Sequence, residues 1–439
     1  MHKRGNILLW VFLSLGAVGG LWPQPVYAIP VFARIYDKPC GACHTVFPQL
    51  NPTGENFRAQ GLHGFTPAIK PLKVGPLEIP ATLPFAISFG IGEDLSKVDT
   101  PGRANPTHTH FNFEFLSLLA GGELGSHLAF LADYALLITN PQTGETQVNT
   151  RPGMAFVQAH AEKGGWLNNF KIGVFELPLG ASPRVHRLSV QPYLIYGLSA
   201  FSLLGRPPPV RGARKDTLTL AATQIGIEVS GLQPATGLGW ALGSTTGSNN
   251  RVDNNASKDF YLHLSRAYKF QKLGFFLYYS PDLLGPGKQN QALRLGPDFT
   301  FYSRRFRFVG QFLAAYDSNP TDHSQDLWYY GGFLEGNYRF TPTLVSLLRL
   351  DYVWTPTFDD TSVGGFTRVR RRLWGVTGGG QWLVLENLKL VAEATYSENH
   401  EGVTERTVKS WSFTVRLVTT FWPLTPPGLS EWLDRRRRR

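Results

Sequence analysis

The residues best suited to chemistry in this 439-residue chain are its two cysteines, which lie together in Cys40-Gly41-Ala42-Cys43-His44. Two thiols at this spacing reach the two vinyl groups of one haem, and the adjacent imidazole then lies beneath the iron. The motif therefore predicts one haem c, attached through Cys40 and Cys43 and ligated on its proximal side by His44.

Two other kinds of site compete for the same residues. A structural zinc ion needs four ligands, whereas Cys40, Cys43 and His44 supply three and no fourth follows at a defined spacing nearby. A disulfide between the cysteines suits an oxidising compartment but leaves His44 without a role. A C-x-x-C-H motif in an exported chain with no other cysteine favours haem over both.

The distal ligand of the iron is less closely specified. His63 is the nearest candidate, and a bis-histidine haem would have a lower potential than a His/Met haem; the competing interpretation is a solvated loop histidine. Met154 is the single methionine that remains after signal removal, but it lies far from the motif in a predicted strand. Met154 and His160 are the next candidates if His63 does not bind the iron.

The first residues predict export. Residues 2–4 are basic, residues 7–21 are mostly apolar, and small residues precede a cleavage site after Ala28. The competing interpretation is an uncleaved membrane anchor, but glycines interrupt the apolar run and Pro23 ends it. No later segment has the 18 consecutive apolar residues of a membrane helix, so we expect strands to make any membrane crossing.

Composition supports strands and argues against a nucleic-acid partner. The chain has 46 Gly, 30 Phe, 16 Tyr and 11 Trp with 17% charged residues, which suits strands with apolar outer faces. The net charge is +11, but the terminal run Arg435 to Arg439 contributes five of these charges. No compact basic module remains, and we expect no nucleic-acid partner.

From about Pro84 to Trp422 the sequence alternates with period two between Gly, Pro, Asn and Asp clusters. Phe111, Phe113 and Phe115, for example, alternate with polar residues. We expect about sixteen strands, with tight turns after even-numbered strands and long loops after odd-numbered ones. The expected strand starts are near residues 84, 107, 126, 151, 168, 217, 236, 257, 272, 291, 305, 325, 343, 367, 388 and 407.

This pattern predicts an all-β fold, a transmembrane outer-membrane β-barrel with the short haem segment plugging the lumen. The competing interpretation is a soluble sandwich, which would turn its polar faces outward. Instead, polar residues share the face opposite the apolar one and should point inward. These residues are His263, Arg294 with Asp298, Glu335 with Arg339, and Arg349 with Asp351.

We expect four parts in the chain: a signal peptide (1–28), a monohaem cytochrome c segment (29–80), a porin-like barrel (81–422) and an arginine-rich tail (423–439). The haem segment is too short to bury a haem and a stable core unaided, so it needs the barrel wall as a second surface. An electron would then cross an apolar band about 25 Å tall by way of a haem held in the lumen, instead of in one step.

The N-terminal residues resemble the outer-membrane fused monohaem cytochrome-porins, a family linked to extracellular iron(II) oxidation. The matching motif residues are Pro30 to Arg34, Cys40 to His44, Pro48 to Asn51, Gly54, Phe57 and Gly61; the rest matches by architecture. The resemblance implies that Cys40 and Cys43 carry the haem and that His44 ligates it. It further implies that Pro48 to Asn51 shapes the adjacent loop, and we expect Arg34, Pro48 and Asn51 among the haem-binding residues.

The function expected from these observations is electron transfer in the cell outer membrane of a Gram-negative-type bacterium. Electrons would pass from extracellular iron(II) or another reductant, through one haem, to a periplasmic c-type cytochrome or copper protein, with outer-membrane lipid and lipopolysaccharide as surroundings. An iron(II):cytochrome c oxidoreductase is one form of this activity, and a simple electron carrier is the other. Candidate lumen contacts for iron(II) are His108, His110, Glu114, Asp133 and His160, although each is more simply explained as polar lumen lining.

Two alternatives remain: a porin whose haem is a structural plug or redox sensor, and a haem peroxidase, which needs an open iron position. The loop at about 178–216 is basic and suits chelated or anionic donors or lipopolysaccharide phosphates, although an ordinary solvated loop is the simpler interpretation. Its cationic residues are Arg184, His186, Arg187, Arg206, Arg211, Arg214 and Lys215. We interpret the terminal arginines as a solvated tail, in preference to a binding site for an acidic cytochrome.

Overall fold

The computed structural model describes most of the chain after the predicted signal peptide. The described residues are 31–68, 71–75, 77–79, 85–102, 105–139, 146–148, 152–204, 219–249, 256–269, 271–285, 288–320, 326–360, 367–385, 387–402 and 405–421. The expected signal peptide (1–28) and arginine-rich tail (423–439) lie outside these residues.

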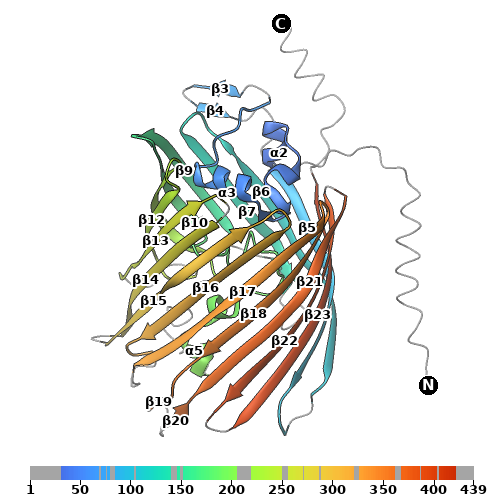
Figure 1. The fold of residues 1–439 in the computed structure, drawn as a ribbon, viewed down its shortest axis with the longest axis vertical. Helices are drawn as coiled ribbons and strands as arrows, with labels where there is room; N and C mark the ends of the chain where they lie inside the picture. The colour runs from blue at the N-terminus through green and yellow to red at the C-terminus, as the bar shows by residue number, and fades with distance from the viewer. Residues whose placement is uncertain are drawn as a thin grey trace, which may run out of the picture.

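The main body is a closed antiparallel barrel, in which β23 pairs with β5 to complete the ring (Figure 1). Its strands are β5 (Phe85–Asp99), β6 (Thr107–Glu123), β7 (Leu128–Thr139), β9 (Met154–Lys163), β10 (Trp166–Phe175), β11 (Gln224–Gln233), β12 (Leu238–Thr245), β13 (Asp259–Tyr268), β14 (Gln271–Gly285), β15 (Lys288–Tyr302), β16 (Phe306–Asp317), β17 (Leu327–Thr341), β18 (Leu344–Trp354), β21 (Arg371–Leu385), β22 (Leu388–Glu401) and β23 (Arg406–Phe421). The short β8 (Thr146–Val148) pairs with the far end of β7 and shares the position of β9. The sixteen-stranded all-β barrel expected from the sequence is therefore confirmed.

Most strand starts lie within a few residues of their predicted positions, but four details differ. β11 begins at Gln224, later than the expected residue 217, and β5 continues to Asp99, into residues for which the alternation predicted one of the long loops that follow odd-numbered strands. The connection after β14 is short, because β14 and β15 stay paired out to Gly285 and Lys288. A long β19–β20 hairpin (Phe358–Asp360, Thr367–Val369) lies between β18 and β21.

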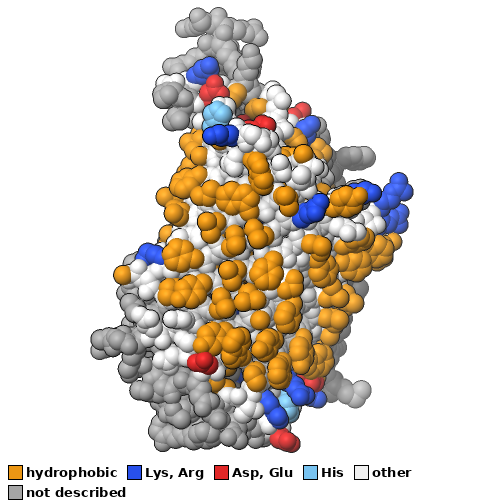
Figure 2. All heavy atoms as spheres, turned by 60° about the vertical axis from the view of Figure 1, so that its left-hand side comes forward, with side chains coloured by type: hydrophobic (Ala, Val, Ile, Leu, Met, Phe, Trp, Pro, Cys, Tyr) orange, Lys and Arg blue, Asp and Glu red, His pale blue; other side chains and the backbone are white. Residues whose placement is uncertain are grey.

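The outer wall is apolar and the inner wall is polar. Along β16, Phe306, Phe308 and Phe312 are exposed, whereas the intervening Arg307 and Gln311 are buried. Hydrophobic side chains cover the barrel wall between its two rims, and charged side chains gather toward the rims (Figure 2). A closed barrel with an apolar outer band is a form in which strands can cross a membrane, because every backbone group is paired within the ring.

Several of the inward-facing charges form ion pairs, although not always as the sequence suggested. Arg349 pairs with Asp351 at 2.7 Å as expected. Arg294 pairs with Asp317 at 2.7 Å instead of Asp298, which lies 2.9 Å from His263 Nε2. Arg349 and Asp351 lie on the same strand, β18, whereas the other two pairs join different strands, so their partners depend on strand register and not on closeness in the chain.

The N-terminal segment folds into short elements at one end of the barrel (Figure 1). They are α2 (Val31–Tyr36), the 3₁₀ turn η1 (Cys40–Ala42), β1 (His44–Val46), β2 (Gln49–Leu50), α3 (Pro52–Ala59) and the hairpin β3 (Leu72–Val74) and β4 (Leu77–Ile79). α3 begins where the Asn51 side chain accepts a hydrogen bond from the Gly54 amide at 3.0 Å, with Pro52 at the first helical position.

This segment lies at the tight-turn end of the barrel, which we define by the short connections 124–127, 164–165, 303–305 and 342–343. Hydrogen bonds to inward-facing residues link it to the barrel there. They join Tyr302 to Glu55 (2.8 Å), Gln49 to Asn337 (2.8 Å), Lys389 to the Phe47 carbonyl (2.8 Å) and Asn169 to the Ala59 carbonyl (2.9 Å). The lumen is therefore occupied at this end, as the expected plug requires.

The connection from β10 to β11 also folds inward, where the sequence suggested an ordinary solvated loop. It carries α4 (Leu194–Gly197) and α5 (Ala200–Leu204), and Tyr193, Tyr196 and Leu203 are buried against the wall. Apolar packing explains the difference, since Tyr193 stacks on Phe333 with ring centroids 3.9 Å apart. Arg206, Arg211, Arg214 and Lys215 lie outside the described residues. None of the described helices has both the length and the apolar character to cross a membrane.

Candidate haem-binding site

Cys40, Cys43 and His44 form one compact turn. The two cysteines are not joined in a disulfide, and the Cys43 amide donates to the Cys40 carbonyl at 3.2 Å, which closes the turn. His44 Nδ1 lies 3.1 Å from the Pro48 carbonyl oxygen, an acceptor, so Nδ1 is the protonated nitrogen. This leaves Nε2 as the free ligand atom, in the arrangement usual for histidines that bind metal.

Burial lowers the pKa of His44 to about 4, so its imidazole is neutral at ordinary pH. The positive charge of His186, when present, acts in the same direction. A neutral imidazole is the form that ligates iron, so the surroundings of His44 favour metal binding over protonation.

Asn51 and Gly54 hold the turn in place from α3. Asn51 Nδ2 donates to the carbonyl oxygens of Gly41 (3.2 Å) and Ala42 (3.1 Å), which ties the start of the helix to the turn. A Cβ at position 54 would lie 2.1 Å from the Cys43 carbonyl oxygen, so glycine is required for this close approach. The expected roles of Pro48 and Asn51 thus have a structural basis: both bond to the turn and shape it.

A cavity of about 190 Å³ lies beside the two cysteines and His44. Its walls come from α2, from α3 and from the inner faces of β6, β7 and β9, and they are mostly apolar. Apolar lining residues include Val31, Phe32, Phe57, Leu62, Phe65, Leu119, Leu131, Met154 and Phe156. Two thiols, one neutral imidazole and an apolar enclosure fit the needs of a haem c, so the residues present are consistent with that group.

The two distal candidates lie differently with respect to this cavity. Met154 lines it and is 3% exposed. His63 is not among the described residues that line it: its Nδ1 lies 2.8 Å from the Gly61 carbonyl oxygen, and its ring stacks on His160 at 5.4 Å. The geometry therefore brings Met154 to the same cavity as His44 and turns His63 and His160 toward each other.

Three other residues differ from the expected haem-binding set. Arg34 donates to the Phe85 carbonyl oxygen at 2.8 Å and ties α2 to β5, and it is not among the described lining residues. Arg58 and His186 do line the cavity, although sequence analysis did not place either residue at the haem. Arg58 follows Phe57 on α3, close in sequence to the C-x-x-C-H motif. This closeness was the signal that could have predicted a cation at the cavity.

The residues expected to contact iron(II) are not brought together. His108 and His110 stack on each other at 6.1 Å on β6, whereas Glu114 forms an ion pair with Arg416. Asp133 lines the apolar cavity beside the cysteines, and His160 stacks on His63. In the described part of the chain, no group of three or more His, Cys, Asp or Glu side chains is placed to hold a metal ion.

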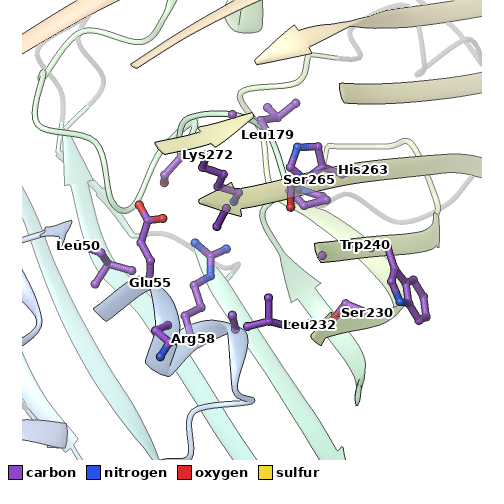
Figure 3. Close-up of a pocket in the computed structure, with 18 of the residues that line it drawn as sticks. Leu50, Glu55, Arg58, Leu179, Ser230, Leu232, Trp240, His263, Ser265 and Lys272 are labelled. Atoms are coloured by element: carbon purple, nitrogen blue, oxygen red, sulfur yellow. The ribbon is translucent and has the colours of Figure 1, made fainter. Parts of the chain in front are cut away.

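A larger cavity of about 620 Å³ lies on the other side of α3 (Figure 3). Glu55 and Arg58 project into it from the helix, toward the barrel wall that carries His263 and Lys272. Leu50, Arg58 and His186 line both cavities, so they form the partition between them.

Glu176 holds the loop that carries His186. Its carboxylate accepts hydrogen bonds from the Ser182 hydroxyl (2.8 Å) and from the amides of Arg184 (2.9 Å) and Val185 (2.6 Å), and it lies 4.0 Å from His186 Nδ1. Burial alone would raise the pKa of Glu176, but His186, Arg58 and these donors lower it to about 2. The carboxylate is therefore ionised and holds the loop at the cavity edge.

Comparisons with known proteins support the barrel. No protein-family model matches the chain, and no curated protein matches it. Among solved structures, the outer-membrane channel DcaP of Acinetobacter baumannii is similar with a TM-score of 0.51 at 8% identity, covering 80% of this chain and 100% of that one. An anion-selective porin from Comamonas acidovorans has a TM-score of 0.51 at 10% identity, covering 77% of this chain and 99% of that one.

The fold is thus that of the outer-membrane porin-type β-barrels. In its N-terminal segment this barrel carries the C-x-x-C-H turn and the apolar cavity beside it.

Proposed function

We propose that this protein is an outer-membrane electron-transfer protein that carries one haem c, attached to Cys40 and Cys43 and ligated by His44. The observation that supports it best is the enclosure of these three residues with an apolar cavity between the N-terminal segment and the barrel wall. A bound haem supplies a one-electron iron(III)/iron(II) couple. The chain supplies the attachment, the proximal imidazole and exclusion of water.

The orientation of the barrel suggests the direction in which electrons flow. The haem segment lies at the tight-turn end, which in outer-membrane barrels is the periplasmic side. We propose that an extracellular donor delivers electrons from the loop side, and that a periplasmic c-type cytochrome or copper protein receives them at the tight-turn end. Iron(II) as the donor rests on the sequence resemblance alone, since the residues expected to bind it lie apart.

We further propose Met154 as the distal ligand in preference to His63. Met154 faces the cavity that His44 lines, whereas the His63 ring is engaged by the Gly61 carbonyl and by His160. A thioether ligand raises the potential of a haem relative to a second imidazole, which suits an acceptor for electrons from iron(II). Filling this position would also argue against a peroxidase, which needs an open iron site.

The second candidate is a porin whose haem is structural or senses redox state, and the porin-type fold favours it. The buried inward connection that carries Tyr193 and Tyr196 argues for a filled lumen instead. An anoxic optical titration separates the two functions. Purified protein, oxidised and then mixed with iron(II), should show prompt reduction of the haem if it accepts electrons from that donor.

A haem that is reducible by dithionite but not by iron(II) would reject iron(II) as the donor. Reduction by iron(II) with no electron passed on to an added soluble c-type cytochrome would reject transfer to a periplasmic carrier and favour the sensor. The control is a Cys40→Ala/Cys43→Ala variant, which should show no haem signal in either step.

A further inference from the structure

A third cavity, of about 730 Å³, opens at the tight-turn end between the N-terminal segment and the ends of β13 to β18. The N-terminal segment contributes Thr45 and Asn51 to Thr53, and the barrel contributes five cationic side chains. Those five are Lys269, Arg304, Arg305, Arg307 and Arg339, and no Asp or Glu is among the described lining residues. All the charged side chains among the described lining residues are therefore positive.

Arg307 is the innermost of these cations and is only 9% exposed. Its register partners are Tyr302 on β15 and Asn337 on β17, which places the three side chains in one row on the inner wall. Arg307 donates to the Tyr302 hydroxyl and to Asn337 Oδ1, both at 3.4 Å, the long limit for a hydrogen bond. A guanidinium carries five donors, so these two weak bonds leave most of its capacity unused.

No carboxylate of the described residues forms an ion pair with Arg307. The two that act on it electrostatically are Glu55 and Glu335. Glu55 accepts from Tyr302 at 2.8 Å, and Glu335 accepts from Asn337 at 3.0 Å. Both carboxylates therefore stabilise the charge of Arg307 without contacting it. The unused donors of this nine-tenths buried guanidinium are left for an anion that enters the cavity.

Membrane lipid is not the source of this anion, because Arg307 faces away from it. The neighbours Phe306 and Phe308 point outward and are 45% and 38% exposed, so Arg307 between them points into the barrel. Lys269, Arg304, Arg305 and Arg339 are exposed around the mouth of the cavity. They would draw an anion inward by long-range attraction that salt screens.

We infer that this cavity is an oxyanion-binding site, with Arg307 at its base, that takes a carboxylate or phosphate group arriving from the tight-turn side. Either a free anion or an acidic side chain of a soluble protein presents this chemistry. The inference stands on the barrel and does not depend on the haem, so its failure and that of the proposed function are distinguishable.

Calorimetric titration of the full-length protein in detergent at low ionic strength tests the site, with sodium phosphate and a polyglutamate peptide as probes. Binding of phosphate identifies a free-anion site, and binding of polyglutamate alone identifies a site for protein carboxylates; both outcomes support the inference. Arg307→Gln should weaken the binding about tenfold or more, because charge-assisted hydrogen bonds are lost.

Arg304→Gln/Arg305→Gln changes only exposed turn residues and should weaken binding without affecting the fold. The matched control is Lys73→Gln, which removes an exposed cation that lies 3.5 Å from Glu78 on the β3–β4 hairpin and should leave binding unchanged. The inference is overturned if neither probe binds, if polylysine binds as well as polyglutamate, or if both arginine variants bind like the unaltered protein.

Discussion

His44 Nδ1 lies 3.1 Å from the carbonyl oxygen of Pro48, and this hydrogen bond leaves Nε2 as the one free nitrogen of the imidazole. Asn51, three residues further along, bonds to the carbonyls of Gly41 and Ala42 within the same motif. The turn that would carry the proposed haem is thus preorganised by the loop that follows it, and the barrel then encloses the cavity beside it.

The close packing at Gly54 yields a first prediction. Gly54→Ala places a Cβ against the Cys43 carbonyl and should destabilise the N-terminal segment by about 1–3 kcal/mol, the usual cost of overpacking. Haem content of the purified protein should fall with it. Gly41→Ala is the matched control, since a Cβ there meets nothing within 4 Å. Equal haem content in the two variants would contradict the proposed packing.

The distal ligand provides a second prediction. Met154→Leu keeps the apolar volume but removes the thioether, so the ferric haem should lose its methionine-to-iron charge-transfer absorption and its potential should fall. His63→Ala should leave both unchanged. The assignment is wrong if Met154→Leu keeps the spectrum and potential of the unaltered protein, and a loss of the low-spin spectrum in His63→Ala or His186→Gln would transfer the role to that histidine.

Glu176 gives a prediction about pH. Its folded-state pKa of about 2 lies below the ordinary 4.5, so its contribution to stability is complete above pH 4.5 and disappears as pH falls toward 2. Glu176→Gln should therefore destabilise the inward loop at neutral pH, by at most about 3 kcal/mol. The rate of tryptic cleavage after Arg184 or Arg187 measures how readily this loop unfolds.

At pH 7 the Glu176→Gln variant should be cleaved faster than the unaltered protein. An acid-stable protease should then show the difference shrinking between pH 4.5 and pH 2. A difference that stays constant over that range would mean that the carboxylate charge has no role in holding the loop.

The barrel could be predicted from sequence because its signal is local. Alternation such as Phe111, Phe113 and Phe115 against polar neighbours repeats along each strand, and short turns separate the strands at regular intervals. The starts of β18 and β22 were thereby predicted within a residue. Strand pairing, as between Arg294 and Asp317, could not be predicted, because it depends on cross-strand register.

The C-x-x-C-H motif behind the proposed haem was recognised from its spacing alone, but the side chains that line the adjacent cavity could not be predicted. Met154 and His186 reach the cavity only through the closure of the barrel and the inward fold of the loop. His63 was preferred because it is near in the chain, yet its bond to the Gly61 carbonyl and its stacking on His160 set its orientation. Closeness to the motif in the sequence therefore did not indicate which side chains line the cavity.

The most direct test of the account is a haem measurement on the exported, full-length protein from a host that matures c-type cytochromes. After denaturation and electrophoresis, the protein band should retain haem, and its pyridine haemochrome spectrum should be that of a haem joined by two thioether bonds. Cys40→Ala/Cys43→Ala should give a colourless band. A colourless unaltered protein, with its two cysteines in a disulfide or on zinc, would contradict the account.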